Sequence, residues 1–126
     1  MSGIVALDHV QLAMPPSGEE AADRFYAGVL GLEVVPKPPV LAARGGRWYV
    51  APGSGVQLHL GVDTDFRPAT RAHPALRVAG LDEVAERIVA AGLQWRWDEE
   101  LVGARRGYAE DPFGNRIELI DASQSG

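Results

Sequence analysis

The stretch VQLHLGV, residues 56–62, alternates between apolar and polar positions along its whole length. Val and Leu side chains occupy one face, and Gln57, His59 and Gly61 occupy the other. Strict alternation predicts a β-strand with one buried face. The histidine in the middle of the opposite face is the residue that needs a functional explanation.

Alternating stretches also open each half of the chain. Ile4–Met14 predicts a strand with His9 on its polar face, and His73–Val78 predicts a second strand with His73 on the same kind of face. An amphipathic helix follows each of them, at residues 19–30 and 81–92. Further strands are expected at Glu33–Val35, Arg47–Val50, Gln94–Trp97, Arg106–Glu110 and Arg116–Ile120, with a loop at 37–46.

The ends and faces of the two helices carry recognisable signals. Ser17 followed by Glu20 has the spacing of a capping box, and Gly31 is expected to end the first helix. In the second helix, acidic residues occupy the first turn and Gly92 marks the end. The expected core-facing side chains are Phe25, Val29 and Leu30, and then Leu81, Val84, Ile88 and Val89.

Strand–helix–strand–strand–strand therefore occurs twice. The opening histidines are 73 − 9 = 64 residues apart, and His59 and Glu118, on the two closing strands, are 118 − 59 = 59 apart. A repeat of this length predicts two equivalent modules, about 4–63 and 72–121, within one domain of 1–126. The expected fold class is α+β, with two βαβββ modules whose curled mixed sheets surround a central cleft.

Composition limits the classes of function. The chain has 126 residues, 46% of them hydrophobic, with a formal net charge of −5, which argues against nucleic-acid binding. It has no apolar run long enough to span a bilayer and no recognisable secretory signal. It has no cysteine, so disulfides and thiolate ligands are excluded. These features predict a cytoplasmic protein without membrane association.

Four residues on the polar strand faces could bind a metal ion. His9, His59, His73 and Glu118 fall on the first and last strands of the two modules, and imidazole and carboxylate groups suit zinc, nickel, manganese or iron(II). Each residue alone has an ordinary explanation, such as a solvated histidine or a carboxylate paired with Arg116. The chain has only three histidines, however, and all occupy corresponding positions. The joint pattern favours one shared site.

Strand parity also yields candidate substrate contacts. Arg77 and Arg106 could hold a carboxylate or phosphonate, and Trp48 or Trp97 could form an apolar wall. Surface arginines are usually only solvated, and strand tryptophans usually belong to the core. The full set of substrate candidates is Gln11, Gln57, Arg77, Arg106, Tyr108 and Trp48.

Four segments resemble the vicinal oxygen chelate superfamily: LDHVQLAM from Leu7, FYAGVLGLEVV from Phe25, HPALRV with LDEVAERIVAAG from His73, and EDPFGNRIELID from Glu110. This superfamily includes glyoxalase I, the fosfomycin-resistance and bleomycin-resistance proteins and the ring-cleaving dioxygenases. The resemblance covers nearly the whole chain and implies paired βαβββ modules around a divalent metal. It implies that His9, His73 and Glu118 are ligands.

His59 departs from this pattern, because the glyoxalase I branch has a glutamate at the corresponding position. His59 could complete a shell of three histidines and one glutamate, or act as a base beside the metal. The resemblance implies a glyoxalase-like, metal-dependent lyase or isomerase that polarises a small oxygen-rich substrate, with Glu118 and His59 as catalytic candidates. No residue is singled out for binding an organic cofactor, and no feature identifies glutathione, another thiol or a catechol as the substrate.

Two other functions remain open. The first is a metal-free protein that sequesters an antibiotic or another small molecule, as the bleomycin-resistance branch does. The second is an iron(II) ring-cleaving dioxygenase. The resemblance also implies a homodimer in which each site takes ligands from both chains, so that His9 and His59 meet His73 and Glu118 of the partner.

Overall fold

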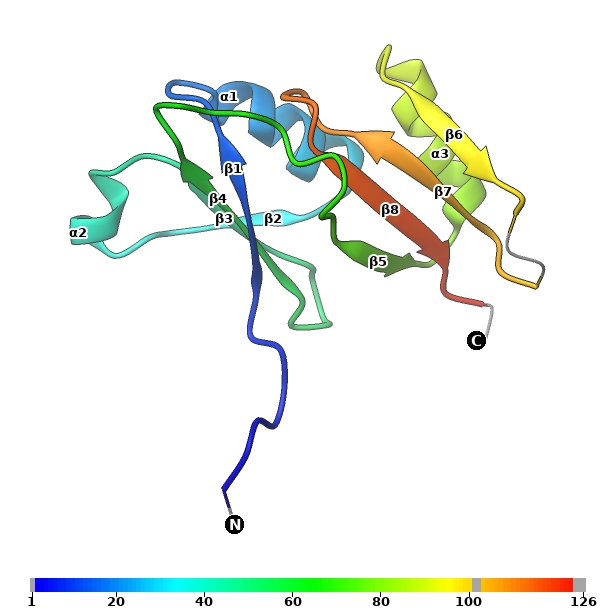
Figure 1. The fold of residues 1–126 in the computed structure, drawn as a ribbon, viewed down its shortest axis with the longest axis horizontal. Helices are drawn as coiled ribbons and strands as arrows, with labels where there is room; N and C mark the ends of the chain where they lie inside the picture. Colours follow the sequence, from blue (N-terminus) through cyan, green and yellow to red (C-terminus); the bar gives the residue numbers. More distant parts are fainter. Residues whose placement is uncertain (1, 101–102, 124–126) are drawn as a thin grey trace.

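The computed structural model of the protein describes residues 2–100 and 103–123 and contains two four-stranded sheets (Figure 1). The first sheet has the order β1-β4-β3-β2, and the second has the order β5-β8-β7-β6. The predicted repeat and the α+β fold class are therefore confirmed. The strands are β1 (Val10–Met14), β2 (Glu33–Val35), β3 (Arg47–Val50), β4 (Gln57–Val62), β5 (Ala75–Val78), β6 (Trp95–Asp98), β7 (Arg106–Glu110) and β8 (Arg116–Asp121).

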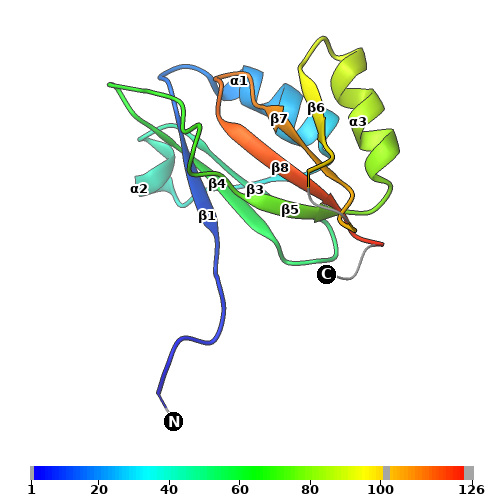
Figure 2. The same ribbon diagram turned by 45° about the vertical axis from the view of Figure 1, so that its right-hand side comes forward.

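In each sheet the first and last strands in chain order, β1 with β4 and β5 with β8, pair in parallel. The other neighbouring strands pair in antiparallel fashion. The predicted alternation holds in β1, where Leu12 and Met14 are buried and Gln11 is exposed. The strand begins at Val10 rather than Ile4, because Val10 is the first residue that pairs with β4. The segment before it projects away from both sheets (Figures 1 and 2).

The first helix begins differently from the prediction. α1 (Glu19–Ala22) continues into a π-helical segment, η1 (Asp23–Val29), and no side chain caps its N-terminus. The predicted capping box is wrong: Ser17 has φ 65°, and the N-cap is Gly18. A Cβ atom on Gly18 would lie 2.8 Å from the ring of Phe113 in the second module. Packing between the modules therefore requires glycine at the N-cap of α1.

The second helix, α3 (Leu81–Ala90), buries Leu81, Val84 and Ile88 as predicted. Val89, also expected on the buried face, is 59% exposed, and Ala85 takes the remaining buried position. The spacing i, i+3, i+4, i+7 from Leu81 explains the difference, because it passes through 84, 85 and 88. The expected loop at 37–46 contains a short helix, α2 (Pro39–Ala42).

Buried polar bonds join the two modules. The Asn115 side-chain amide, fully buried in the β7–β8 turn, donates to the Ala13 carbonyl at 2.8 Å and to Asp111 at 2.9 Å. The Tyr26 hydroxyl donates to the Asp111 carboxylate at 2.7 Å. The core is continuous across this joint, and its largest members are Tyr26, Tyr49, Phe25, Met14, Leu58, Leu60, Leu81, Ile88, Ile117 and Leu119.

None of the helices in the described ranges is long and apolar enough to cross a membrane.

Candidate functional site

The four predicted ligands occupy equivalent places in the two modules. His9 lies two residues before Gln11, which pairs with His59 across the parallel β1–β4 ladder. His73 likewise lies two residues before Ala75, which pairs with Glu118 across β5–β8. The identical offset shows that both modules bring a first-strand histidine beside a last-strand donor group.

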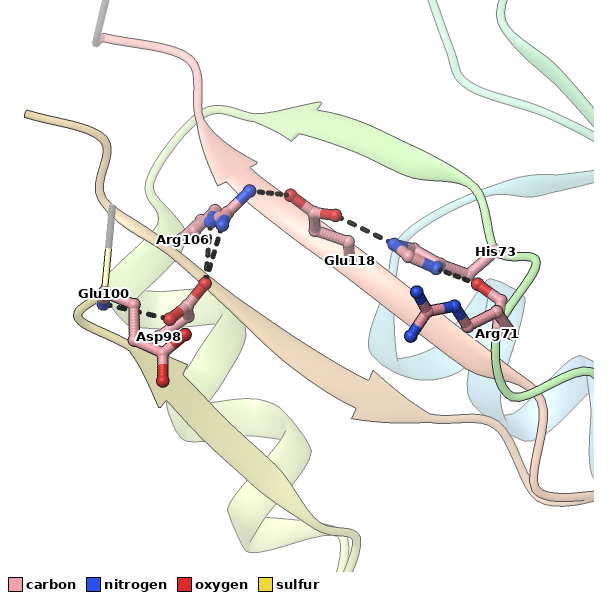
Figure 3. Close-up of polar contacts among 6 residues, drawn as sticks. All are labelled: Arg71, His73, Asp98, Glu100, Arg106 and Glu118. Carbon is pink, nitrogen blue, oxygen red and sulfur yellow. Dashed lines mark hydrogen bonds and ion pairs between the residues drawn. The ribbon is translucent and has the colours of Figure 1, made fainter. Parts of the chain in front are cut away.

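In the second module the two donor groups are in contact. His73 Nε2 lies 2.9 Å from Glu118 Oε1, and His73 Nδ1 lies 2.8 Å from the Arg71 carbonyl (Figure 3). Because a carbonyl only accepts hydrogen bonds, Nδ1 carries a proton, and the contact between Nε2 and the carboxylate needs either a further proton between these two atoms or a cation. A backbone acceptor on one ring nitrogen is the usual outer partner of a metal-ligating histidine.

Glu118 is held from its other side by an arginine. Arg106 donates from Nη1 to Glu118 Oε2 at 3.0 Å and from Nε to Asp98 Oδ2 at 2.9 Å, so that the guanidinium bridges the two carboxylates (Figure 3). The backbone N–H of Glu100 and the charge of Arg106 lower the pKa of Asp98. Glu118 is 6% exposed, and its partners are Arg106 and His73 instead of Arg116.

In the first module the two donors are stacked rings. His9 and His59 have centroids 4.0 Å apart, and Trp48 covers the other face of His59 at 4.6 Å. His9 Nδ1 lies 2.8 Å from the Asp8 carboxylate, and His59 Nε2 lies 3.1 Å from Gln57 Oε1. Burial, followed by the charges of His9 and Lys37, lowers the pKa of His59, so its ring is neutral near pH 7.

The donor set fits a divalent metal. It offers three imidazoles and one carboxylate, and the histidines that precede β1 and β5 both have Nδ1 engaged by an oxygen atom. His73 Nε2 and Glu118 Oε1 are 2.9 Å apart, a hydrogen-bond distance that is slightly shorter than the roughly 3.3 Å between adjacent ligands of tetrahedral zinc. With Nδ1 protonated, this contact requires a second proton on the ring or a cation shared by the two atoms.

One chain does not assemble the whole set. Within residues 2–100 and 103–123, no three His, Cys, Asp or Glu side chains gather closely enough to hold a metal ion. The structure pairs His9 with His59 and His73 with Glu118. Each module therefore carries one pair of candidate donor groups, and each pair is called a half-site below.

The substrate candidates divide between these half-sites. Trp48 and Gln57 contact His59, and Gln11 lines the same pocket. Tyr108, which pairs with Glu118 as Trp48 pairs with His59, packs edge-on against His73 at 5.7 Å. Arg77 is exposed and lines an apolar groove between the modules. Trp97 packs edge-on against Trp95, away from the half-sites.

Asp98, Lys37 and Arg44 are site residues that the sequence analysis missed. Asp98 pairs with Arg106 across β6–β7, and a strand extended by one residue beyond Trp97 would have revealed this opposite-charge pair. Lys37 and Arg44 line the pocket beside His9 and His59. They lie in the connection between β2 and β3, outside the strands, where alternation of apolar and polar residues cannot predict which way a side chain points.

Comparisons with known proteins agree with this geometry. The family described as "Glyoxalase-like domain" matches residues 11–120. A Bacillus anthracis protein described as a glyoxalase family protein is 40% identical in sequence, with a TM-score of 0.89 over 96% of this chain and 98% of its own. No curated protein matches the chain.

Two more distant structures share the fold alone. A mutant of the fosfomycin resistance protein FosX from Listeria monocytogenes, solved with Mn(II) and 1S,2S-dihydroxypropylphosphonic acid, is 19% identical, with a TM-score of 0.74 over 94% of this chain and 90% of its own. TnmS3, an antibiotic binding protein from a Streptomyces species, is 24% identical, with a TM-score of 0.71 over 97% of this chain and 100% of its own.

Proposed function

The chain belongs to the glyoxalase-like family of the vicinal oxygen chelate superfamily, and on this premise we propose that it is a metal-dependent lyase or isomerase. Its substrate is a small oxygen-rich molecule that chelates a divalent metal, either zinc, nickel, manganese or iron(II). The observation that carries the proposal is the His73–Glu118 contact, in which Nδ1 of the histidine is held by the Arg71 carbonyl.

The proposed site lies between two subunits. His9 and His59 of one subunit meet His73 and Glu118 of the other. This arrangement would explain why the two half-sites of one chain do not come together. Exposed apolar surface supports association: Ile4, Val5 and Leu7 are 99%, 97% and 78% exposed on the projecting N-terminal segment. A groove of about 1080 Å³ between the modules, rimmed by His9 and His73, offers further apolar surface to a partner.

The chain's residues would supply binding, orientation and proton transfer. A bound metal would act as a Lewis acid on the substrate oxygens. His59, kept neutral by burial, is suited to accept a proton near pH 7 or to ligate the metal, because the Gln57 amide can either accept from or donate to its ring. Arg106 holds Glu118 Oε2, so a bound metal would take Glu118 Oε1, the oxygen that contacts His73 Nε2 in this structure.

A metal-free sequestering protein is the second candidate. It is favoured by the saturation of Glu118, whose two oxygens already contact Arg106 and His73. TnmS3 shows that the fold occurs in an antibiotic-binding protein. The iron(II) dioxygenase stays a third possibility, since two histidines and one carboxylate are the usual ligands of such enzymes.

Metal analysis separates the first two candidates. Protein purified without chelator is expected to contain about one divalent ion per chain, measured by inductively coupled plasma mass spectrometry, and to lose it in EDTA. Protein that binds none of the four metals at micromolar concentration would exclude the enzyme proposal. A ligand-induced rise in Tm that EDTA leaves unchanged would support sequestration instead.

A mixing experiment tests the shared site. The variants H9A/H59A and H73A/E118A each lack one half-site in every chain and are expected to bind no metal as homodimers. After denaturation and co-refolding in equal amounts, heterodimers contain one complete site, and about a quarter of all sites should recover. No recovery from subunits that demonstrably exchange would contradict a site built between chains.

A further inference from the structure

A pocket of about 450 Å³ lies on the polar face of the first sheet, and His9 and His59 line one part of it. Its volume lies within the range of small-molecule sites. Trp48 and Leu41 contribute apolar surface to the same pocket. A ligand that fills this space therefore contacts both an apolar wall and the two imidazoles.

Two cations give the pocket an excess of positive charge. Lys37 and Arg44 line it, and no carboxylate in the described parts of the chain lies within ion-pair distance of either. The Lys37 ammonium donates to the Gly45 carbonyl, which orients the ammonium without neutralising its charge. Asp8, the acid in this lining, is already bound to His9.

The connection that carries these cations is fixed against the sheet. The Gly46 N–H donates to Glu19 at 2.8 Å, and Gly46 has φ 88°. A Cβ atom on Gly46 would lie 2.3 Å from the Leu60 carbonyl oxygen, so the backbone approaches β4 as closely as only glycine permits. The charge of Lys37 reaches His59, where it contributes to the lowered pKa.

In the second module, Glu118 is already paired with a cation, Arg106. Arg106 is already shared between Asp98 and Glu118 and is therefore poorly placed to bind an anionic ligand. We infer that the first-module pocket binds the anionic group of a small organic molecule, a carboxylate or phosphonate received by Lys37 and Arg44, with its apolar part against Leu41 and Trp48. The identification of this molecule as the substrate rests on the proposed function, whereas its binding does not.

Titrations of metal-free protein in EDTA test the inference. Benzoate and phenylphosphonate are the anionic probes, benzyl alcohol is the neutral probe, and NMR chemical shifts report binding. The anions are expected to bind about tenfold more tightly than the alcohol, because charge-assisted hydrogen bonds are stronger than neutral ones. The stronger of the two anionic probes identifies the preferred head group.

Two double variants localise the effect. K37M/R44M should lose the tenfold preference for anions and keep its affinity for benzyl alcohol. R24M/R67M, which removes the same charge from exposed positions outside the pocket lining, should keep the preference. If K37M/R44M fails to fold, the single variant R44M, which alters an exposed residue, is titrated instead and is expected to lose part of the preference for anions over benzyl alcohol.

Equal affinity for charged and neutral probes, no binding of either anion at millimolar concentration, or an equal loss in R24M/R67M would overturn the inference. Metal content is measured on the same preparations. Normal metal binding without anion preference overturns this inference alone, whereas anion preference without metal binding overturns the proposed function alone.

Discussion

The two modules share one backbone plan but build chemically different half-sites. In the first, His9, His59 and Trp48 form a stack of rings, and the nearby cations stand on a loop. In the second, His73 and Glu118 continue into the buried charges of Arg106 and Asp98. The positions correspond across the repeat, since His59 faces Trp48 and Glu118 faces Tyr108 on the neighbouring strand.

The difference arises at one strand position. Arg106 pairs with Ile120, two residues beyond Glu118. Two residues beyond His59 is Gly61, and because Leu60 pairs with Arg47, the corresponding position in the first module is Gly46. The second module thus fills this position with a guanidinium that neutralises its carboxylate, while the first leaves it without a side chain. Corresponding positions in the two modules therefore share backbone geometry but differ in side-chain charge.

Replacing Glu118 should have the largest effect. E118Q removes the anionic donor and is expected to weaken metal binding by more than about a hundredfold, since loss of an outer-shell partner alone typically costs 10–100-fold. Competition against a chromophoric chelator measures the affinity. E110Q, which alters an exposed carboxylate on the adjacent strand, is the matched control. Equal affinity in the two variants would remove Glu118 from the ligand set.

Two aspartate substitutions should affect different properties. D98N leaves Arg106 paired with Glu118 alone, which strengthens its hold on that carboxylate, and is expected to weaken metal binding about tenfold. D23N instead removes the negative charge and one of the two oxygens that accept from Arg47 and Tyr49 on the helix side of the first module. It should lower the free energy of unfolding by about 1–2 kcal/mol, measured in urea, without changing metal affinity. An effect of D23N on metal binding as large as that of D98N would contradict this division.

The smallest expected effect is a pH dependence from the first module. The pKa of His59 is lowered in the folded protein, so the unfolded chain takes up the proton first as pH falls below about 6.5. The free energy of unfolding of metal-free protein should therefore decrease on acidification through this range. H59Q should show a shallower decrease in urea titrations, and an unchanged slope would exclude this contribution.

Much of the fold could be predicted because its signals are local. Alternation placed His59 and Glu118 on the faces opposite the buried Leu58 and Ile117, and the turn before β8 marked the end of the second module. Predictions failed where a distant contact decided the outcome. Phe113 occupies the space at Gly18, where a capping box was expected to begin the first helix.

The candidate site was predictable as a set of residues and not as an arrangement. The order of residues from Asp98 to Glu118 does not predict that Arg106 bridges both carboxylates, because that contact depends on the register of three strands. The stacking of His9 on His59 likewise depends on the parallel pairing of β1 with β4.

The amino-acid sequence by itself determined the repeat and the strand faces, because the periodic burial of side chains follows from the order of residues along the chain. It also singled out the four candidate donor groups. Only the tertiary structure decided which donors meet, and it divided them into two pairs instead of one cluster. The physical reason is that hydrogen bonding and ring stacking act over a few ångströms, and separations of that size are set by strand register and module packing.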